Sequence, residues 1–379
     1  MTRSSTPPPT RFIPSNLPIL GSEEISAATN VLKTGMLTHK SGAGQNVLKF
    51  EENFAKFVGA KHAIAVNSGT AALHAALLAL DIKPGDEVIA PPFTFIATTN
   101  MILFCGAKVV FADIDPKIYN LDPSKVKSAI TSKTKAIIPV HLYGHPTEMD
   151  PLLELAKKHD LSIVEDCAQA HGAKYKGRRV GTIGDVGCFS LYPSKVITTG
   201  EGGILTTNND ELAVNLRRIR THGEVRPYEF VRLGHNYRMP EIEAAIGVEQ
   251  LKRLPGFLKQ RRKNAEYLTK HLSDIEGISL PFEADWATHN WYLYTVGVKK
   301  PLNRDIVQRK LHEAKIGAAV YYEVPLHLTP IYRKLFNYKE GMMPISEQAT
   351  REVLSLPAHP ALTDSELAWI VEQVHQAVE

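Results

Sequence analysis

The 379-residue sequence predicts an α/β protein, with a large domain built on a mostly parallel sheet between helices and a smaller α+β domain at the C-terminus. Two observations predict this architecture. From about residue 60, short β-rich runs alternate with helical stretches, which is typical of a parallel sheet covered on both faces. Past Pro240 the pattern becomes mainly helical. We therefore place the large domain at residues 21–254 and the small domain at 255–379, after a flexible, proline-rich arm of residues 1–20.

The predicted strands of the large domain are short apolar runs separated by helical stretches or turns. They are Ala63–Val66, Glu87–Ala90, Lys108–Ile114, Ala136–Leu142 and Ser162–Asp166. Helices are expected at Thr70–Leu80 and Pro151–His159, which are rich in helix-forming residues. After Gly181 the runs GCFSLY and GGILTT stand too close together to enclose a helix. We expect an antiparallel pair or an irregular stretch there.

The segment after Pro240 predicts two helices, Glu241–Leu254 and Phe257–Leu272, with a break at Pro255-Gly256. Further along, Asn290–Val298 is typical of a strand, and helices rich in Glu and Ala close the chain. This mixture predicts the α+β character of the small domain.

The composition excludes several classes of protein. Hydrophobic residues make up 44% and charged residues 22%, which is typical of a globular chain and excludes a disordered one. A formal net charge of +4 predicts no nucleic-acid partner. Cys105, Cys167 and Cys188 form no CxxC pair, so we expect no disulfide framework and a cytoplasmic location. No apolar run reaches the roughly 18 residues of a membrane span, so we expect no membrane partner.

Ligands of open parallel sheets bind beyond the carboxyl ends of the strands, so the residues that follow each strand are candidates. The first strand ends in Asn67-Ser68-Gly69-Thr70 and leads into a helix, whose N-terminal N–H groups are suited to an anion. On its own, an ordinary Ser or Thr N-cap explains this segment more simply. Phe95 follows the next strand, where its ring either stacks on a planar ligand or joins the core.

Asp166 ends the strand Ser162–Asp166, and a carboxylate there is costly to bury unless a cation or hydrogen-bond donors satisfy it. Asp166 is therefore a candidate partner for a cationic ligand atom, with Gln169 beside it if a helix begins there. A helix cap with a solvated turn is the alternative. Lys195, five residues after Ser190 in a Ser/Pro/Gly-rich loop, is either a solvated surface charge or a partly desolvated amine suited to bond a carbonyl.

His141 and His145 have the i,i+4 spacing of a helical metal pair. Gly144 and Pro146 argue against a helix at this point, and no HExxH motif follows. We expect structural or substrate-side roles for the two histidines and no metal site.

The order of the candidate residues predicts a cofactor. A helix-terminal anion site, an aromatic residue, Asp166 with Gln169, and Ser190 with Lys195 are together what pyridoxal phosphate requires. The helix terminus takes the phosphate, the aromatic side chain stacks on the ring, the carboxylate pairs with the pyridinium nitrogen, and the lysine amine bonds the aldehyde carbon.

Several longer blocks stand in a matching order: NSGTAAL, GDEVIAPPFTF, VEDCAQAHGA, GDVGCFSLYPSK, GEGG and GHNYRM. Through these blocks, from about Leu17 to Leu362, the sequence resembles the DegT/DnrJ/StrS family of sugar aminotransferases, and within it the perosamine synthases. The resemblance implies the fold of the fold-type I pyridoxal-phosphate enzymes. It also implies a homodimer with shared active sites.

The resemblance assigns roles to particular residues. It implies that Lys195 bonds the cofactor and moves the proton, and that Asp166 is the catalytic partner of the pyridine nitrogen. The further implied cofactor contacts are Gly69, Thr70, Phe95, Gln169, Ser190 and Asn236, the last from the neighbouring subunit. The implied substrate contacts are Thr38, Tyr321 and His327. Glu243 departs from the family pattern, because many relatives carry Gln there.

The resemblance further implies transamination of a nucleotide-activated ketosugar, an NDP-4-keto-6-deoxyhexose, with L-glutamate as amino donor and 2-oxoglutarate as co-product. A first alternative is a 3-keto sugar or a non-nucleotide ketone such as an inosose as the acceptor. A second is a catalytically silent regulatory protein of the same fold.

Overall fold

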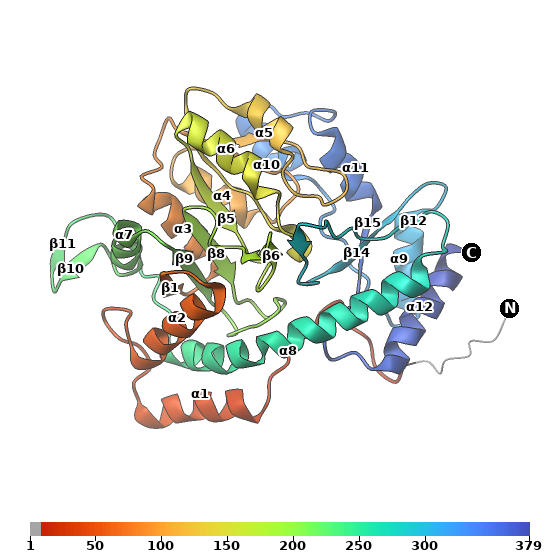
Figure 1. Ribbon diagram of the computed structural model, residues 1–379, viewed down its shortest axis with the longest axis horizontal. Coiled ribbons are helices and arrows are strands. Elements are labelled where there is room, and N and C mark those ends of the chain that lie inside the picture. The colour runs from red at the N-terminus through yellow and green to blue at the C-terminus, as the bar shows by residue number, and fades with distance from the viewer. Residues whose placement is uncertain (1–8) are drawn as a thin grey trace.

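The computed structural model describes residues 9–379. The strands of its main sheet are β1 (His62–Val66), β2 (Glu87–Ala90), β3 (Lys108–Phe111), β4 (Thr134–Ile137), β5 (Ser162–Asp166), β8 (Val186–Ser190) and β9 (Gly203–Thr207). Within the described residues they form one seven-stranded sheet in the order β1-β9-β8-β5-β4-β2-β3 (Figure 1). Only β9 is antiparallel to its neighbours, β1 and β8. The predicted mostly parallel sheet and the predicted antiparallel pair are both confirmed.

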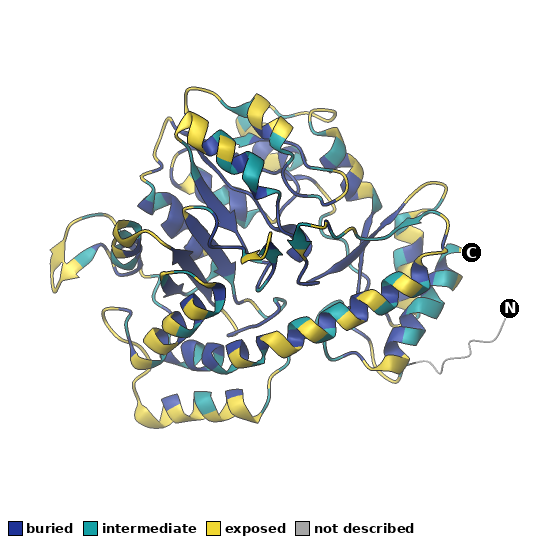
Figure 2. Ribbon diagram, viewed as in Figure 1, coloured by how far each residue is buried: buried dark blue, intermediate teal, exposed yellow. Residues whose placement is uncertain are grey.

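Helices cover both faces of this sheet, whose strands form the buried centre of the molecule (Figure 2). One face packs against α3 (Gly69–Ala79), α4 (Ala97–Phe104) and α7 (Asp210–Arg220). The other packs against α2 (Gln45–Val58), α5 (Pro123–Ala129) and α6 (Met149–His159). The period of two along a strand divides the residues of β1 between the two faces, with Ile64 and Val66 on the first and Ala63 and Ala65 on the second.

The long helix α8 (Glu241–Leu272) joins the two parts of the molecule (Figure 1). It contains Pro255, so the predicted helix break is wrong and the predicted domain boundary at residue 254 falls inside a helix. A proline inside a helix costs about 3 kcal/mol, because it removes a hydrogen bond and crowds the preceding turn. Buried side chains on both sides of it, Leu251, Leu254 and Phe257 among them, offset that cost. The helix α1 (Ser22–Thr34) packs beside the first half of α8.

The C-terminal part has a sheet and a core of its own. Its strands are β12 (Ile278–Ser279), β14 (Tyr294–Val298) and β15 (Val353–Leu356), in the order β12-β14-β15, with α9 (Arg304–Glu313) and α12 (Asp364–Val378) against it. Apolar residues of the second half of α8, such as Leu268, share this core with Val296 and Ile370. The expected α+β character is confirmed.

The remaining elements are short. They are η1 (Leu142–Gly144), β6 (Lys174–Tyr175), β7 (Arg178–Arg179), β10 (Glu224–Arg226), β11 (Glu229–Phe230), β13 (Ala287–Thr288), η2 (Leu326–Leu328), α10 (Pro330–Phe336) and α11 (Pro344–Glu352). The strands β10 and β11 form a hairpin that projects from the large domain (Figure 1). None of the helices among residues 9–379 combines the length and apolar character needed to cross a bilayer.

Residues 9–20, where the sequence predicts a flexible arm, contact both domains and helix α8; residues 1–8 lie outside the described residues. Ile13 is 1% exposed, and its backbone exchanges hydrogen bonds of 2.8 and 2.7 Å with Lys315 and Gly317. Arg11 pairs with Glu366 at 3.1 Å. The composition of this segment alone predicts mobility. The burial of Ile13 and the hydrogen bonds of its backbone stabilise the observed position instead.

Candidate active site

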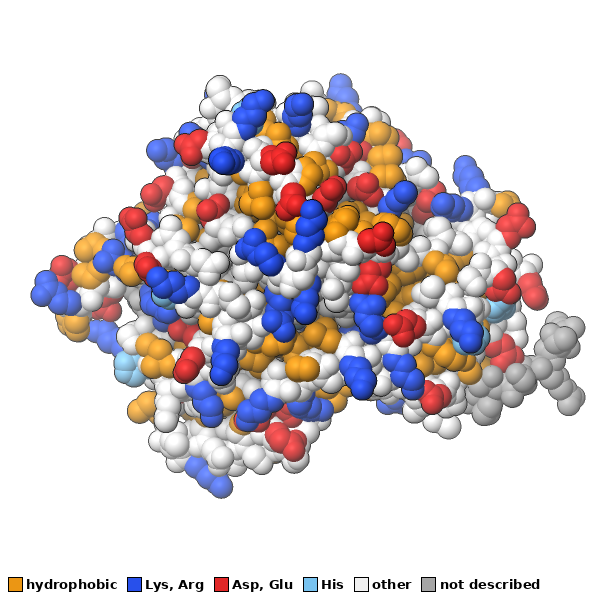
Figure 3. Space-filling model, viewed as in Figure 1, with side chains coloured by type: hydrophobic (Ala, Val, Ile, Leu, Met, Phe, Trp, Pro, Cys, Tyr) orange, Lys and Arg blue, Asp and Glu red, His pale blue; other side chains and the backbone are white. Residues whose placement is uncertain are grey.

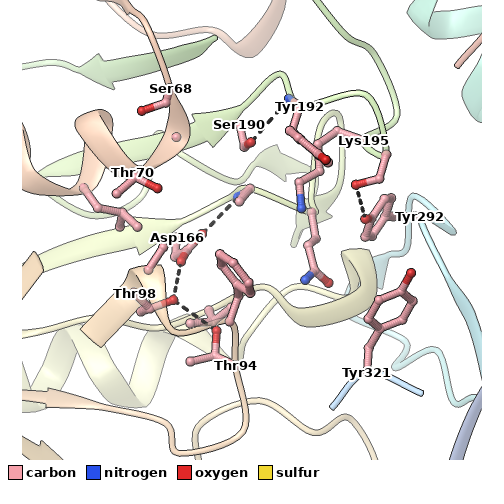
Figure 4. A pocket seen from close by; sticks show the side chains of 18 of the residues that line it. Ser68, Thr70, Thr94, Thr98, Asp166, Ser190, Tyr192, Lys195, Tyr292 and Tyr321 are labelled. Carbon is pink, nitrogen blue, oxygen red and sulfur yellow. Dashed lines mark hydrogen bonds between the residues drawn. The ribbon is translucent and has the colours of Figure 1, made fainter. Parts of the chain in front are cut away.

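A cavity of about 450 Å³ opens where the carboxyl ends of the main-sheet strands meet the small domain. It collects most of the residues that the sequence singled out, and Figure 4 shows several of them facing one another. The predicted residues that line it are Gly69, Thr70, Phe95, Asp166, Gln169, Ser190, Lys195 and Tyr321. Segments up to 126 residues apart in the large domain are thus brought to one site, as the rule for parallel sheets predicts.

The N-terminus of α3 forms one wall of the cavity. Ser68 caps the helix, its hydroxyl oxygen accepting the Ala71 N–H at 3.0 Å. The N–H groups of Gly69 and Thr70 precede the first intrahelical hydrogen bond and are available to an anion. A Cβ at Gly69 would lie 2.7 Å from Cβ of Ser190, so only glycine lets the helix start this close to the end of β8.

Asp166 lies at the end of β5, 4% exposed, and faces the cavity. Its Oδ2 accepts the Thr98 hydroxyl at 2.8 Å and its Oδ1 accepts the Ala168 N–H at 3.1 Å (Figure 4). Burial nevertheless raises the pKa of the Asp166 carboxyl above its ordinary value. A cationic ligand atom in the cavity would supply the partner that favours the ionised form.

Gln169 is held at both ends of its amide, since Oε1 accepts the Tyr143 N–H at 2.7 Å and Nε2 donates to the Tyr322 hydroxyl at 3.1 Å. It stands in a turn, and the helix considered for this segment does not form. The Phe95 side chain is 58% exposed, with its ring centroid 6.4 Å from that of Tyr322. Its exposure at the cavity favours a ligand-stacking role over the core alternative.

Lys195 follows β8 in a loop, where its backbone N–H donates to the Tyr192 carbonyl at 2.9 Å. Its side chain enters the cavity beside Tyr292, with Nζ 5.2 Å from the ring centroid (Figure 4). Lys195 is half-buried at the cavity, which favours the partly desolvated amine over the solvated surface charge that the sequence left open. The tyrosine comes from the small domain, which therefore completes the surroundings of the amine.

Sequence reasoning missed Thr98 and Tyr292 as cavity residues, whereas Tyr322 stands beside Tyr321 in the segment that the family resemblance assigns to the substrate side. Thr98 carried a signal, because it lies one helical turn after Thr94 at the start of α4. Tyr292 carried none, because only the packing of the small domain on the large one brings it to the site.

Three predicted site residues do not line this cavity. His327 departs most clearly from its predicted place at the substrate: it is fully buried, with Nε2 3.0 Å from Oε1 of Glu347, and it packs against Phe111 outside the cavity lining. Thr38 and Asn236 are exposed and are not among the residues that line the cavity of their own chain. The backbone carbonyl of Asn236 accepts a hydrogen bond from Asn67 at 3.3 Å, which leaves its side chain free to face another molecule.

His141, Glu165 and Cys167 lie within 4.8 Å of one another beneath the cavity. The Glu165 carboxylate accepts the N–H groups of residues 181, 183 and 184, each at 2.8 Å, and His141 Nε2 at 3.1 Å. Nδ1 of His141 accepts the Thr147 N–H at 2.9 Å. The ligand atoms of the carboxylate and the imidazole are already engaged, so this group serves as an internal brace for β5, in line with a structural role for His141.

The cavity fits pyridoxal phosphate on its own chemistry. It combines an N–H cradle that a Cβ at Gly69 would obstruct, a buried carboxylate that forms no ion pair with any of residues 9–379, and a primary amine. These three groups match the phosphate, the ring nitrogen and the aldehyde of that cofactor.

Comparison with known proteins gives the same result. A GDP-perosamine synthase of Caulobacter vibrioides is 40% identical over 92% of this chain and 94% of its own. A UDP-N-acetyl-3-dehydro-alpha-D-glucosamine 3-aminotransferase of Acidithiobacillus ferrooxidans is 39% identical over 86% and 87%. The crystal structure of DesV from S. venezuelae, in complex with a ketimine intermediate, superposes with a TM-score of 0.91 at 37% identity, covering 96% of this chain and 99% of that one.

Residues 18–375 match the model of the DegT/DnrJ/EryC1/StrS aminotransferase family. The match spans both domains and includes every residue assigned to the cavity. The cofactor is pyridoxal phosphate, and the fold is that of the fold-type I aminotransferases. The chain therefore belongs to the DegT/DnrJ/EryC1/StrS family, and it is a pyridoxal-phosphate-dependent sugar aminotransferase.

Proposed function

We propose that this enzyme transfers the amino group of L-glutamate to the keto carbon of an NDP-4-keto-6-deoxyhexose, giving a nucleotide-linked amino sugar and 2-oxoglutarate. The observation that carries the proposal is the convergence of the α3 N-terminus, Asp166 and Lys195 on one cavity. The similarity to a GDP-perosamine synthase supports this acceptor.

Each of the cavity residues has a separate role in the proposed transamination. When bound, pyridoxal phosphate withdraws electrons from the carbon that carries the amino group. Asp166 holds the proton on the ring nitrogen, because its buried carboxylate gains a cationic partner there. The Nζ amine of Lys195 would act as the base that takes the proton from the amino-bearing carbon. Gly69, Thr70 and Ser190, which line the cavity, would hold the phosphate, while Gln169 and Phe95 would orient the ring.

The acceptor site lies on the small-domain side of the cavity, where Tyr321 lines the wall. The Tyr321 carbonyl accepts a close hydrogen bond from the Tyr143 hydroxyl, so its backbone is anchored to the large domain. The alternative acceptors, a 3-keto sugar or an inosose, remain a second candidate, which the similarity to a UDP-N-acetyl-3-dehydro-alpha-D-glucosamine 3-aminotransferase supports.

The working unit that we propose is a homodimer with shared sites. Asn236 and Thr38 do not line the cavity of their own chain, so each serves cofactor or substrate only if it reaches the cavity of a partner. The segment before Asn236 exposes large apolar side chains, with Tyr228 at 84% and Leu233 at 91% exposure. Hydrophobic side chains lie on this projecting hairpin among charged ones of both signs (Figure 3), as at a surface that a second copy covers.

The test of the acceptor is a panel of nucleotide ketosugars incubated with enzyme and L-glutamate, with products identified by mass and by the position of the new amine. Amination of 4-keto-6-deoxyhexoses supports the proposal, whereas amination of 3-keto sugars alone contradicts it. An enzyme that neither binds pyridoxal phosphate nor consumes glutamate would instead support the silent regulatory protein. We place the reaction in the cytoplasm, in keeping with three free, buried cysteines.

A further inference from the structure

Ser194, the residue before the proposed cofactor lysine, is hydrogen-bonded by side chains from two distant parts of the chain. We propose that Asn16, Arg261 and Tyr292 are positioning residues that hold the Ser194–Lys195 loop so that the lysine amine faces the cofactor aldehyde. This inference rests on the proposed role of Lys195. We call the three residues together with Ser194 the lysine clamp.

The first arm of the lysine clamp is Asn16, which belongs to the docked N-terminal segment. Its Nδ2 donates a close hydrogen bond to the carbonyl oxygen of Ser194. Its Oδ1 accepts Nη2 of Arg261 at 2.8 Å and the Leu17 N–H at 3.0 Å. Because both ends of the amide are engaged, Asn16 ties the loop of the large domain to helix α8.

The second arm is Tyr292. Its hydroxyl lies 3.3 Å from the Ser194 hydroxyl, and its ring lies under the Lys195 ammonium at 5.2 Å from the centroid (Figure 4). A cation beside an aromatic face is attracted by the ring quadrupole, most strongly where water is scarce. Ser194 is thus held through its carbonyl by one arm and through its hydroxyl by the other.

Arg261 joins the two arms. Its side chain is 2% exposed, and Nη1 donates to the carbonyl oxygens of Trp291 at 3.2 Å and Tyr292 at 3.1 Å. Among residues 9–379 all of its hydrogen bonds end on neutral oxygens, and no carboxylate pairs with it. Burying a guanidinium without an anion is costly. An apolar residue could be buried at this position with a lower free-energy cost. The presence of Arg261 therefore points to a role in fixing the geometry of the Ser194–Lys195 loop.

The lysine clamp matters most when Lys195 is not bonded to the cofactor. The loop then loses its covalent anchor, and only the lysine clamp keeps the amine at the aldehyde. Without the clamp, the amine would bond more slowly, while the N–H groups at the start of α3 and the Asp166 carboxylate at the end of β5 would keep their places.

The experiment measures covalent capture in the dimeric apoprotein. Pyridoxal phosphate is added, and borohydride trapping at intervals gives the rate at which the Lys195 amine bonds the aldehyde carbon with loss of water. The affinity for pyridoxamine phosphate, which has no aldehyde, is measured in parallel. The variants are Asn16→Ala and Tyr292→Phe, and the matched control is Arg11→Ala, which breaks the Arg11–Glu366 pair of the same N-terminal segment.

Asn16→Ala and Tyr292→Phe are each expected to slow trapping by about three- to tenfold, the effect of one lost hydrogen bond. Affinity for pyridoxamine phosphate and trapping by Arg11→Ala stay at the wild-type level. Amide hydrogen exchange of residues 191–199 rises in the two clamp variants, with no change in β5. Unchanged trapping, or an equal loss in Arg11→Ala, would overturn the proposal.

Arg261 offers a further pair of variants. Arg261→Lys, which keeps the charge and part of the bonding, should recover more of the trapping rate than Arg261→Met. If Arg261→Met does not fold, the comparison of Asn16→Ala with Arg11→Ala still decides the matter. If Lys195→Ala is trapped as fast as the wild type, the assignment of the lysine fails, which is distinct from a failure of the clamp.

Discussion

The hydroxyl of Thr98 donates a hydrogen bond of 2.8 Å to Oδ2 of Asp166, and through it the start of α4 orients the carboxylate at the end of β5. Oδ2 accepts no other hydrogen bond from residues 9–379, while Oδ1 accepts the Ala168 N–H at 3.1 Å, so Thr98 supplies one of the two donors that orient the Asp166 carboxylate.

Thr98→Val keeps the shape of the side chain and removes the donor. We expect kcat/KM to fall by about tenfold to a hundredfold, because hydrogen bonds to charged groups contribute about 1.5–3 kcal/mol. Steady-state kinetics of glutamate consumption measure the effect. Thr99→Val, on the same helix turn but without contact to Asp166, is the control, and an equal loss there would mean that the helix has been disturbed.

Gly69→Ala tests the close approach of α3 to β8. The new Cβ would meet Cβ of Ser190 at 2.7 Å and its Cα at 3.1 Å, so either the helix start or the strand end must move. We expect the affinity for pyridoxal phosphate, followed by its visible absorbance, to fall by at least about tenfold. Gly256→Ala, where a Cβ meets nothing within 4 Å, should leave that affinity unchanged. Wild-type affinity in Gly69→Ala would contradict the phosphate site.

Glu243 makes stability depend on pH. Burial, together with the nearby charge of Glu201, raises the pKa of Glu243 to about 7. Between the ordinary pKa of a glutamate and about 7, the folded protein keeps a proton that the unfolded chain has released, so the free energy of unfolding falls as pH rises through this window. Glu243→Gln, which always carries the neutral amide, avoids this loss.

We therefore expect Glu243→Gln to be more stable than the wild type by about 1–2 kcal/mol above pH 7, after allowance for partial exposure, and by little at pH 5. Urea unfolding at both pH values measures the difference. Glu249→Gln, which removes a carboxyl on the same helix that pairs with Lys252, should show a similar change at both. A pH-independent gain in Glu243→Gln would contradict the assignment.

Shared active sites predict complementation between two inactive variants. Lys195→Ala and Asn236→Ala are each expected to be inactive alone. When they are mixed and allowed to exchange subunits, one site of each mixed dimer combines an intact Lys195 from one chain with an intact Asn236 from the other. Activity should recover to about a quarter of the wild-type level, since mixed dimers are half of the population and hold one intact site of two. No recovery despite subunit exchange would place Asn236 in its own chain's site.

Much of the fold and of the cofactor site could be predicted from local sequence, because each part has a local physical cause. Glu87–Ala90 and Ser162–Asp166 are strands with the predicted bounds, since short apolar runs between turns have few other solutions. Gly69 and Asp166 were found because helix starts and buried strand ends have a recognisable chemistry. The helix break predicted at Pro255 was wrong because the packing of α8 outweighed the tendency of proline to end a helix.

Contacts between distant segments could not be predicted in this way. Tyr292 reaches Lys195 only because the small domain packs on the large one, and no residue near Tyr292 signals this. Asn16 stands in a segment whose composition predicts mobility, yet Ile13 and Arg11 dock it. His327 was predicted from a family block, whereas its burial beside Glu347 depends on the whole fold.

The central claim is that Lys195 is the residue that performs transamination. The measurement that tests it most directly is a single turnover: cofactor-loaded enzyme is mixed with L-glutamate, and 2-oxoglutarate is counted against the number of sites. The wild type is predicted to release one 2-oxoglutarate per site as the visible absorbance of the cofactor falls, while Lys195→Ala releases about none on the same time scale. Release of 2-oxoglutarate by Lys195→Ala at the wild-type rate would contradict the account.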